Sequence, residues 1–167
     1  MKVGIVGAGL GGLSLALMLH QRGIECEVWE AAAHLKPLGV GINLLPHAVR
    51  ELTEVGLLDR LAEMGVETSQ LAYYNRLGQP IWREPRGRAA GYAWPQFSIH
   101  RGEFQMLLAE VARQRLGEQA LQLGWRAESF EDDGDGAIVT LRGRDGATHR
   151  ARFDVLVAAG VGLETTT

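Results

Sequence analysis

The stretch Val3-Gly4-Ile5-Val6-Gly7-Ala8-Gly9-Leu10-Gly11-Gly12, continued to Cys26-Glu27-Val28-Trp29-Glu30, decides the fold of this chain. The apolar run from Lys2 to Val6 is too short for a stable helix and suits a strand that is buried on both faces. The glycines that follow form the pattern G-x-G-x-x-G. The first glycine permits a tight turn, the second lets a pyrophosphate approach the backbone, and the third lets helix and strand pack closely. The phosphates would then lie at the positive N-terminus of the next helix.

A helix and a second strand are expected directly after this turn. Apolar residues at helical spacing predict a helix from residue 10 or 11 to about Gln21, with Gly23 as its stop. Glu25 to Trp29 is the second strand, and Glu30 closes it 18 residues after the third glycine. This is near the roughly 20-residue spacing at which a carboxylate accepts from a ribose hydroxyl, and the same charge would repel the 2′-phosphate of NADP. The unit therefore predicts an α/β domain that binds a dinucleotide.

The composition indicates one globular domain. The chain has 167 residues, 46% hydrophobic and 22% charged, and a net charge of −3 that gives no reason to expect nucleic acid or a membrane as a partner. The single Cys26 lies in a predicted buried strand, which favours a core thiol in a reducing, cytoplasmic compartment. No signal peptide, no apolar run of the roughly 18 residues that span a membrane, and no Cys or His spacing for a metal are expected.

The segment after the first unit does not continue with another simple repeat. Ala31 to Leu45 is predicted to be a loop, in which Gly39 and Gly41 would let the backbone lie flat against a planar ligand. Pro46 opens a helix, and Gly56 is expected to split this helical segment into two short helices.

A hairpin and a basic loop follow. Residues Gln70 to Trp82 predict a hairpin, and Glu84 to Gln96 is rich in Arg, Gly and Pro and is expected to be a surface loop. Three arginines in this region could neutralise an anionic ligand, but a solvated basic loop is the favoured interpretation: Arg83, Arg86 and Arg88.

The second half of the chain predicts a helix and then strands. Ser98 to Arg101 precedes a helix from Glu103 to Leu116, and His100 is interpreted as structural because no other candidate base or nucleophile lies beside it. Leu121 to Leu123 suits a strand. A three-stranded meander should then form from Trp125–Glu131, Ala137–Leu141 and Thr148–Phe153.

The last apolar run, Asp154 to Ala159, suits a central parallel strand beside the first. Gly160 to Thr167 is expected to trail off without a helix.

Several segments resemble the single-component FAD-dependent aromatic hydroxylases, which share the fold of para-hydroxybenzoate hydroxylase, and in particular their phenazine-modifying members. The matching segments follow the order found in that family: Gly7–Ser14, Pro37–Asn43, Glu84–Gly87 and Ser98–Glu103. The resemblance implies a Rossmann-like FAD-binding domain with a β-meander, and it assigns residues 70–96 to the start of a substrate-domain sheet. It also implies FAD as cofactor, NADH or NADPH as transient reductant, and hydroxylation of a small aromatic or heteroaromatic substrate with O₂.

The same resemblance implies a set of cofactor-binding residues and assigns no catalytic side chain. It implies that the glycine turn holds the FAD pyrophosphate and that Glu30 holds the adenosine ribose. Val40 and Gly41 would lie beside the isoalloxazine ring, while Arg101 and Gln105 would contact the ribityl and phosphate region. The implied residues are Gly7, Ala8, Gly9, Leu10, Gly11, Gly12, Glu30, Lys36, Val40, Gly41, Arg101 and Gln105.

Two departures from the family pattern shape the expected function. The stretch Ala158-Ala159-Gly160-Val161 lacks the aspartate of the family's Asp-Gly motif, and the family's second half has no counterpart here. We therefore expect residues 1–167 to be a truncated FAD-binding domain that is inactive alone. Exposed aromatic residues would then favour a homodimer: Tyr73, Tyr74, Trp82 and Trp94.

Two other functions remain open at this point. An NAD-dependent dehydrogenase shares the opening unit, although no compact second βαβ repeat follows Glu30. A non-catalytic dinucleotide-binding fragment would fit the short length and the missing Asp-Gly motif.

Overall fold

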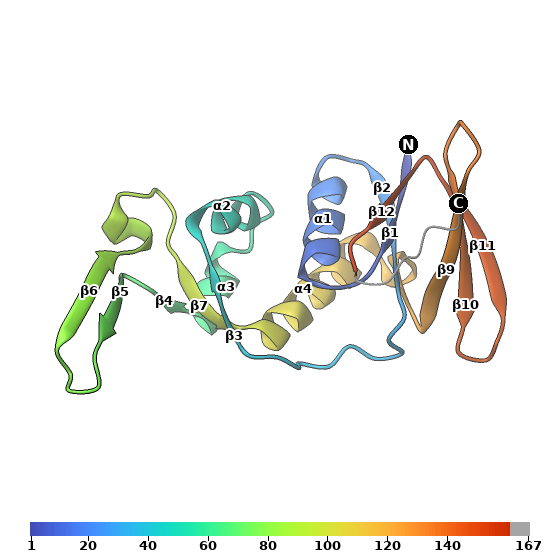
Figure 1. Ribbon diagram of the computed structural model, residues 1–167. Helices are drawn as coiled ribbons and strands as arrows, with labels where there is room; N and C mark the ends of the chain where they lie inside the picture. The colour runs from blue at the N-terminus through green and yellow to red at the C-terminus, as the bar shows by residue number, and fades with distance from the viewer. Residues whose placement is uncertain (161–167) are drawn as a thin grey trace. The chain divides into compact units, whose positions relative to one another are not determined.

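The computed structural model describes residues 1–160 and divides the chain into two compact units (Figure 1). Unit 2 is the continuous segment Leu38–Phe104. Unit 1 combines Met1–Pro37 with the described residues from Gln105 onward. Unit 2 is therefore inserted, in sequence, between the two segments of unit 1. The expected course of the last seven residues lies outside the described part of the chain.

A four-stranded parallel sheet forms the centre of unit 1, in the order β12-β1-β2-β8 (Figure 1). The elements that build this layer are β1 (Lys2–Val6), α1 (Leu10–Gln21), β2 (Glu25–Glu30), α4 (Arg101–Leu116), the short 3₁₀ helix η2 (Glu118–Ala120), β8 (Leu121–Leu123) and β12 (Val155–Ala158). The opening strand, helix and strand are confirmed at their predicted bounds. The expected position of the last strand is only half right. It pairs with β1 as predicted, but it forms an edge of the described sheet, where Val155 is 44% exposed.

Helix α1 covers one face of this sheet. Its Leu13, Ala16 and Leu17 are buried, and the Cys26 thiol of β2 donates to the Ala16 carbonyl at 3.7 Å. Burial raises the pKa of this thiol, which keeps it protonated and unreactive. Because side chains alternate along a strand, Trp29 of β2 faces the opposite side of the sheet from Cys26.

The predicted meander packs on that opposite side. Its strands β9 (Trp125–Asp132), β10 (Ala137–Gly143) and β11 (Thr148–Phe153) are antiparallel in the order β11-β10-β9. The core between the meander and the parallel sheet contains Trp29, Ala127, Val139, Leu141 and Phe153. A Cβ at Gly4 would lie 2.4 Å from the Phe153 ring, so β1 needs a glycine there for the ring to pack on its backbone.

Unit 2 contains a three-stranded antiparallel sheet in the order β3-β7-β4 and a separate hairpin (Figure 1). Its elements are β3 (Gly41–Leu44), α2 (Pro46–Glu54), α3 (Leu58–Met64), β4 (Val66–Glu67), β5 (Gln70–Tyr74), β6 (Pro80–Pro85), the 3₁₀ helix η1 (Gly87–Ala90) and β7 (Phe97–His100). The hairpin and the two helices split near Gly56 are confirmed. The prediction of an uninterrupted loop over 31–45 is wrong, because β3 forms there by pairing with β7.

Alternation along β3 and β7 separates an apolar face from a polar face. Leu44, Phe97 and Ile99 are buried, whereas Asn43 and Ser98 are exposed. The loop predicted over 84–96 is also more ordered than expected, since β6 reaches Pro85 and η1 follows. No helix within residues 1–160 is long and apolar enough to span a bilayer.

Candidate functional site

The glycine turn between β1 and α1 has the geometry that its pattern predicts. Gly7 has φ +110°, a conformation that L side chains rarely adopt. A Cβ at Gly12 would lie 2.0 Å from the Gly7 carbonyl oxygen, so only glycine lets the helix approach the strand this closely. Among residues 1–160, a Cβ at Gly9 would have only the Ala159 oxygen nearby, at 4.0 Å. Packing within this described part of the chain does not require glycine at position 9, so a ligand could approach the backbone there.

No side chain within the described residues caps the N-terminus of α1. Gly9 is the N-cap residue, no side chain bonds to the cap, and the first turn has no acidic residue. The first intrahelical bond runs from the Leu13 N–H to the Gly9 carbonyl at 3.0 Å, so the N–H groups of residues 10–12 have no partner within the helix. These donors and the helix dipole form an arrangement that suits a phosphate.

Two predicted ligand side chains hold the backbone of Ala8. Glu30 Oε2 accepts from the Ala8 N–H at 2.8 Å, and Glu30 Oε1 accepts from the Ala32 N–H at 2.8 Å. Gln105 Nε2 donates to the Ala8 carbonyl at 2.8 Å. Both polar groups of Ala8 are therefore fixed by side chains far away in sequence, and we call the two bonds to Ala8 the Ala8 clamp. The clamp orders the turn and was not anticipated, because nothing in the sequence pattern links residues 8 and 105.

The end of β12 lies against the same turn. The Ala159 N–H donates to the Val6 carbonyl at 2.8 Å, and a Cβ at Gly7 would lie 3.0 Å from Gly160 N. The part of the chain that lacks the family's aspartate is thus a neighbour of the glycine turn. Lys36, also in unit 1, is exposed in a stretch without helix or strand.

Three predicted cofactor residues belong to unit 2, where the structure brings them together. Val40 is exposed, Gly41 begins β3, and Arg101 begins α4. The Arg101 N–H donates to the Val40 carbonyl at 3.1 Å. A Cβ at Gly39, where φ is +140°, would lie 3.3 Å from Arg101 Cβ, so this glycine lets the loop pass close to the helix start.

The three arginines near the hairpin differ in exposure and in their partners, although the same interpretation was predicted for all three from the sequence. Arg83 is exposed and donates to the Tyr74 hydroxyl at 2.8 Å, and exposed Arg88 pairs with Glu67 at 3.1 Å. The solvated interpretation is confirmed for these two. It is wrong for Arg86, whose side chain is only 32% exposed and whose Nε is buried without a hydrogen-bond partner among the described residues.

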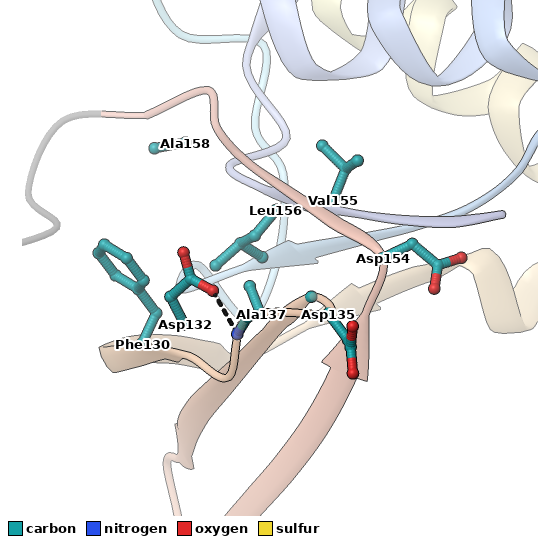
Figure 2. Close-up of a pocket in the computed structure, with 10 residues that line it drawn as sticks. Phe130, Asp132, Asp135, Ala137, Asp154, Val155, Leu156 and Ala158 are labelled. Carbon is teal, nitrogen blue, oxygen red and sulfur yellow. Dashed lines mark hydrogen bonds between the residues drawn. The ribbon is translucent and has the colours of Figure 1, made fainter.

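A hollow of about 710 Å³ lies beside β12, at the start of β10 and the β9–β10 turn (Figure 2). Figure 2 shows that apolar residues such as Phe130 and Leu156 line it together with the carboxylates of Asp132, Asp135 and Asp154. Three carboxylates disfavour the binding of a pyrophosphate. This hollow is therefore distinct from the glycine turn and does not suit the phosphates of a dinucleotide.

Comparison with known proteins identifies the family. The model of the FAD binding domain matches residues 1–162. The chain is 45% identical over 158 residues to phenazine 1,6-dicarboxylic acid hydroxylase PhzS of Lysobacter antibioticus, covering 93% of this chain and 39% of the relative. It is 34% identical to 3-amino-4-hydroxybenzoate 2-monooxygenase of Streptomyces cremeus, covering 95% and 39%.

A solved structure of Klebsiella pneumoniae HpxO in complex with FAD and uric acid superimposes with a TM-score of 0.74 at 28% identity, covering 93% of this chain and 38% of that one. The chain thus spans about two fifths of the length of the curated relatives it matches. These matches confirm the expected α/β fold of an FAD-binding domain. They do not support the alternative interpretation of the chain as an NAD-dependent dehydrogenase. The chain therefore belongs to the FAD binding domain family, whose model covers residues 1–162.

Proposed function

We propose that this chain is the FAD-binding portion of a monooxygenase that hydroxylates an aromatic carboxylic acid with NADH or NADPH and O₂. The observation that carries the proposal is the open glycine turn at the uncapped N-terminus of α1 in a chain of this family. By name, the two relatives act on a phenazine dicarboxylic acid and on an amino-hydroxybenzoate, and these names support an aromatic acid as the substrate class. FAD would supply the redox chemistry, while the protein supplies binding and orientation.

The adenosine diphosphate part of FAD would bind in unit 1. The N–H groups of Leu10 and Gly11, with the open backbone at Gly9, would hold the pyrophosphate. The Glu30 carboxylate has acceptor capacity beyond its two backbone bonds, so it can also accept from a ribose hydroxyl. Ala8, held by its clamp, would keep the turn in the binding conformation before the cofactor arrives.

The flavin end would use residues of unit 2. The exposed backbone at Val40 and Gly41 would lie beside the isoalloxazine ring, and the Arg101 guanidinium would contact the ribityl or phosphate oxygens. Lys36 would add a second positive charge near the phosphates, without the planar fork of an arginine.

We further propose that residues 1–167 act as the FAD-binding domain, that residues 70–96 begin the substrate-domain sheet, and that the chain is inactive alone. The exposed aromatic side chains of the hairpin, which lie on both of its faces, support a homodimer through this part of the chain: Tyr73, Tyr74 and Trp82. Light scattering that shows a monomer at every concentration would contradict the dimer. A cytoplasmic location stays a prediction, supported by the buried free thiol of Cys26.

The purified chain tests the proposed function through its visible absorption. Stoichiometric bound flavin would support it, whereas tight NAD binding without flavin would favour a dehydrogenase, and neither ligand would favour a non-catalytic fragment. With FAD bound, NADH oxidation should not rise on addition of phenazine-1,6-dicarboxylate, because the chain alone is expected to be inactive. Stimulated oxidation would refute that part of the proposal.

A further inference from the structure

Arg86 lies between two hollows of unit 2. The first has a volume of about 350 Å³ and includes Pro46 and His47 in its wall, and the second has about 360 Å³. Both share Leu45, Arg86 and Gln96. Volumes of this size suit a small organic ligand.

The guanidinium of Arg86 has an unfilled binding edge. Nη2 forms an ion pair with Glu84, while Nε is buried and has no partner within residues 1–160. Nε and Nη2 lie on the same edge of the planar group, where an arginine holds a carboxylate through two parallel hydrogen bonds. Because Nε has no partner, Glu84 does not complete that bidentate arrangement. A buried donor without a partner is costly and is often explained by a ligand or an ordered water.

The second hollow also contains hydrogen-bonding groups from the polar face of the β3-β7-β4 sheet. Ser98 Oγ donates to Asn43 Oδ1 at 2.7 Å and lies 2.9 Å from Thr68 Oγ1. Asn43 accepts through its oxygen in this chain of bonds, and no hydrogen bond within residues 1–160 uses its amide N–H groups. These groups lie in the wall that contains Arg86, so a polar ligand would meet further donors there.

An aromatic surface continues along the same face of the hairpin. Because side chains alternate along β6, Trp82 lies on the face that carries Glu84. Trp82 pairs with Tyr73 across the hairpin, with ring centroids 5.9 Å apart. This face of the hairpin therefore has the aromatic rings of Tyr73 and Trp82 at one end and the Nε–Nη2 edge of Arg86 at the other. Such an arrangement fits a planar molecule that carries a carboxylate.

We propose that Arg86 binds the carboxylate of an aromatic acid, which displaces Glu84 and accepts from both Nε and Nη2. Glu84 is then a competitor that holds Arg86 until the ligand arrives. This assignment rests on the proposed function, since it names the group that recognises the substrate class proposed above.

The opposite effects of two substitutions test the site. In the FAD-loaded chain, calorimetry would measure the affinity for phenazine-1,6-dicarboxylate, with unsubstituted phenazine as the neutral probe. Arg86→Met should weaken binding of the dicarboxylate about tenfold or more, because charge-assisted hydrogen bonds are lost. Glu84→Gln should leave binding unchanged or strengthen it, because the competing carboxylate is removed. Neither substitution should change binding of phenazine.

Two further variants control for charge and for folding. Arg88→Met removes a nearby exposed arginine and should leave the affinity for the dicarboxylate within about twofold of the unsubstituted chain. Arg86→Lys keeps the charge but loses the fork, so it should bind less tightly than the unsubstituted chain even if Arg86→Met fails to fold. Weakening by Glu84→Gln to the same extent as by Arg86→Lys would overturn the proposal, because it would indicate a structural ion pair only. A flavin-loaded chain without selective carboxylate binding refutes this site alone, whereas a chain without flavin refutes the proposed function.

Discussion

The substitution Gly12→Ala tests most directly whether the close approach of α1 to β1 requires a glycine at position 12. A Cβ there would lie 2.0 Å from the Gly7 oxygen and 3.3 Å from the Ala159 Cβ. Since such contacts are essentially never under 3.0 Å, strand and helix must separate by about 1 Å. Overpacking of this kind costs about 1–3 kcal/mol, and the better helix propensity of alanine returns up to about 1 kcal/mol. We expect Gly12→Ala to lower the free energy of unfolding by about 1–2 kcal/mol.

Gly11→Ala is the matched control, because no heavy atom of residues 1–160 outside the helix backbone and the chain neighbours lies within 4 Å of a Cβ at that position. Only the gain in helix propensity remains, so its stability should stay equal or rise. With a urea m-value of about 2 kcal/mol/M, Gly12→Ala should lower the unfolding midpoint by about 0.5–1 M. Circular dichroism measures the midpoint, and quenching of flavin fluorescence measures FAD binding, which should weaken in the same variant. Equal midpoints for the two variants would refute the view that close packing requires glycine at position 12.

Two further predictions concern hydrogen bonds to carboxylates. Glu30→Gln should destabilise the flavin-free chain by about 1–2 kcal/mol, because an amide cannot accept with both atoms from Ala8 and Ala32; an unchanged urea midpoint would contradict this. On the meander, the hydrogen bond from Arg152 holds the pKa of Asp133 below its ordinary value. The stabilisation from this pair should be complete above the ordinary carboxyl pKa and should disappear as the pH falls through the lower, folded-state value. Arg152→Gln should raise the Asp133 pKa in an NMR titration, and an unchanged pKa would show that the bond does not form in solution.

Local signals in the sequence were sufficient for the opening unit. The short apolar run, the glycine stops and the helical spacing all lie within thirty residues, and β1, α1 and β2 have their predicted bounds. The four-residue β3 was missed because its partner is distant, with Gly41 opposite His100. A strand this short has no periodic pattern of its own, so only the pairing defines it.

The candidate site shows the same limit. The spacing after the turn predicts Glu30 as a ribose ligand. It does not predict the hydrogen bond from the Ala8 N–H to Glu30, because this bond depends on the tertiary fold. The sequence alone does not distinguish the arginines near the hairpin. Arg86 is less exposed than Arg83 because the end of β6 packs near Gln96, and this contact depends on the tertiary fold.

The two-segment composition of unit 1 has a consequence for how the chain folds during synthesis. Strand β1 pairs with β12, in which Val155 lies opposite Val3. This strand pair cannot form until residue 155 has been synthesised. Unit 2 is continuous and contains both partners of each of its strand pairs. A nascent chain that has reached Phe104 therefore holds every residue of unit 2 but only the first strand, helix and strand of unit 1. We expect the inserted unit to fold first on the ribosome, and the glycine turn to reach its final form only after β12 has emerged.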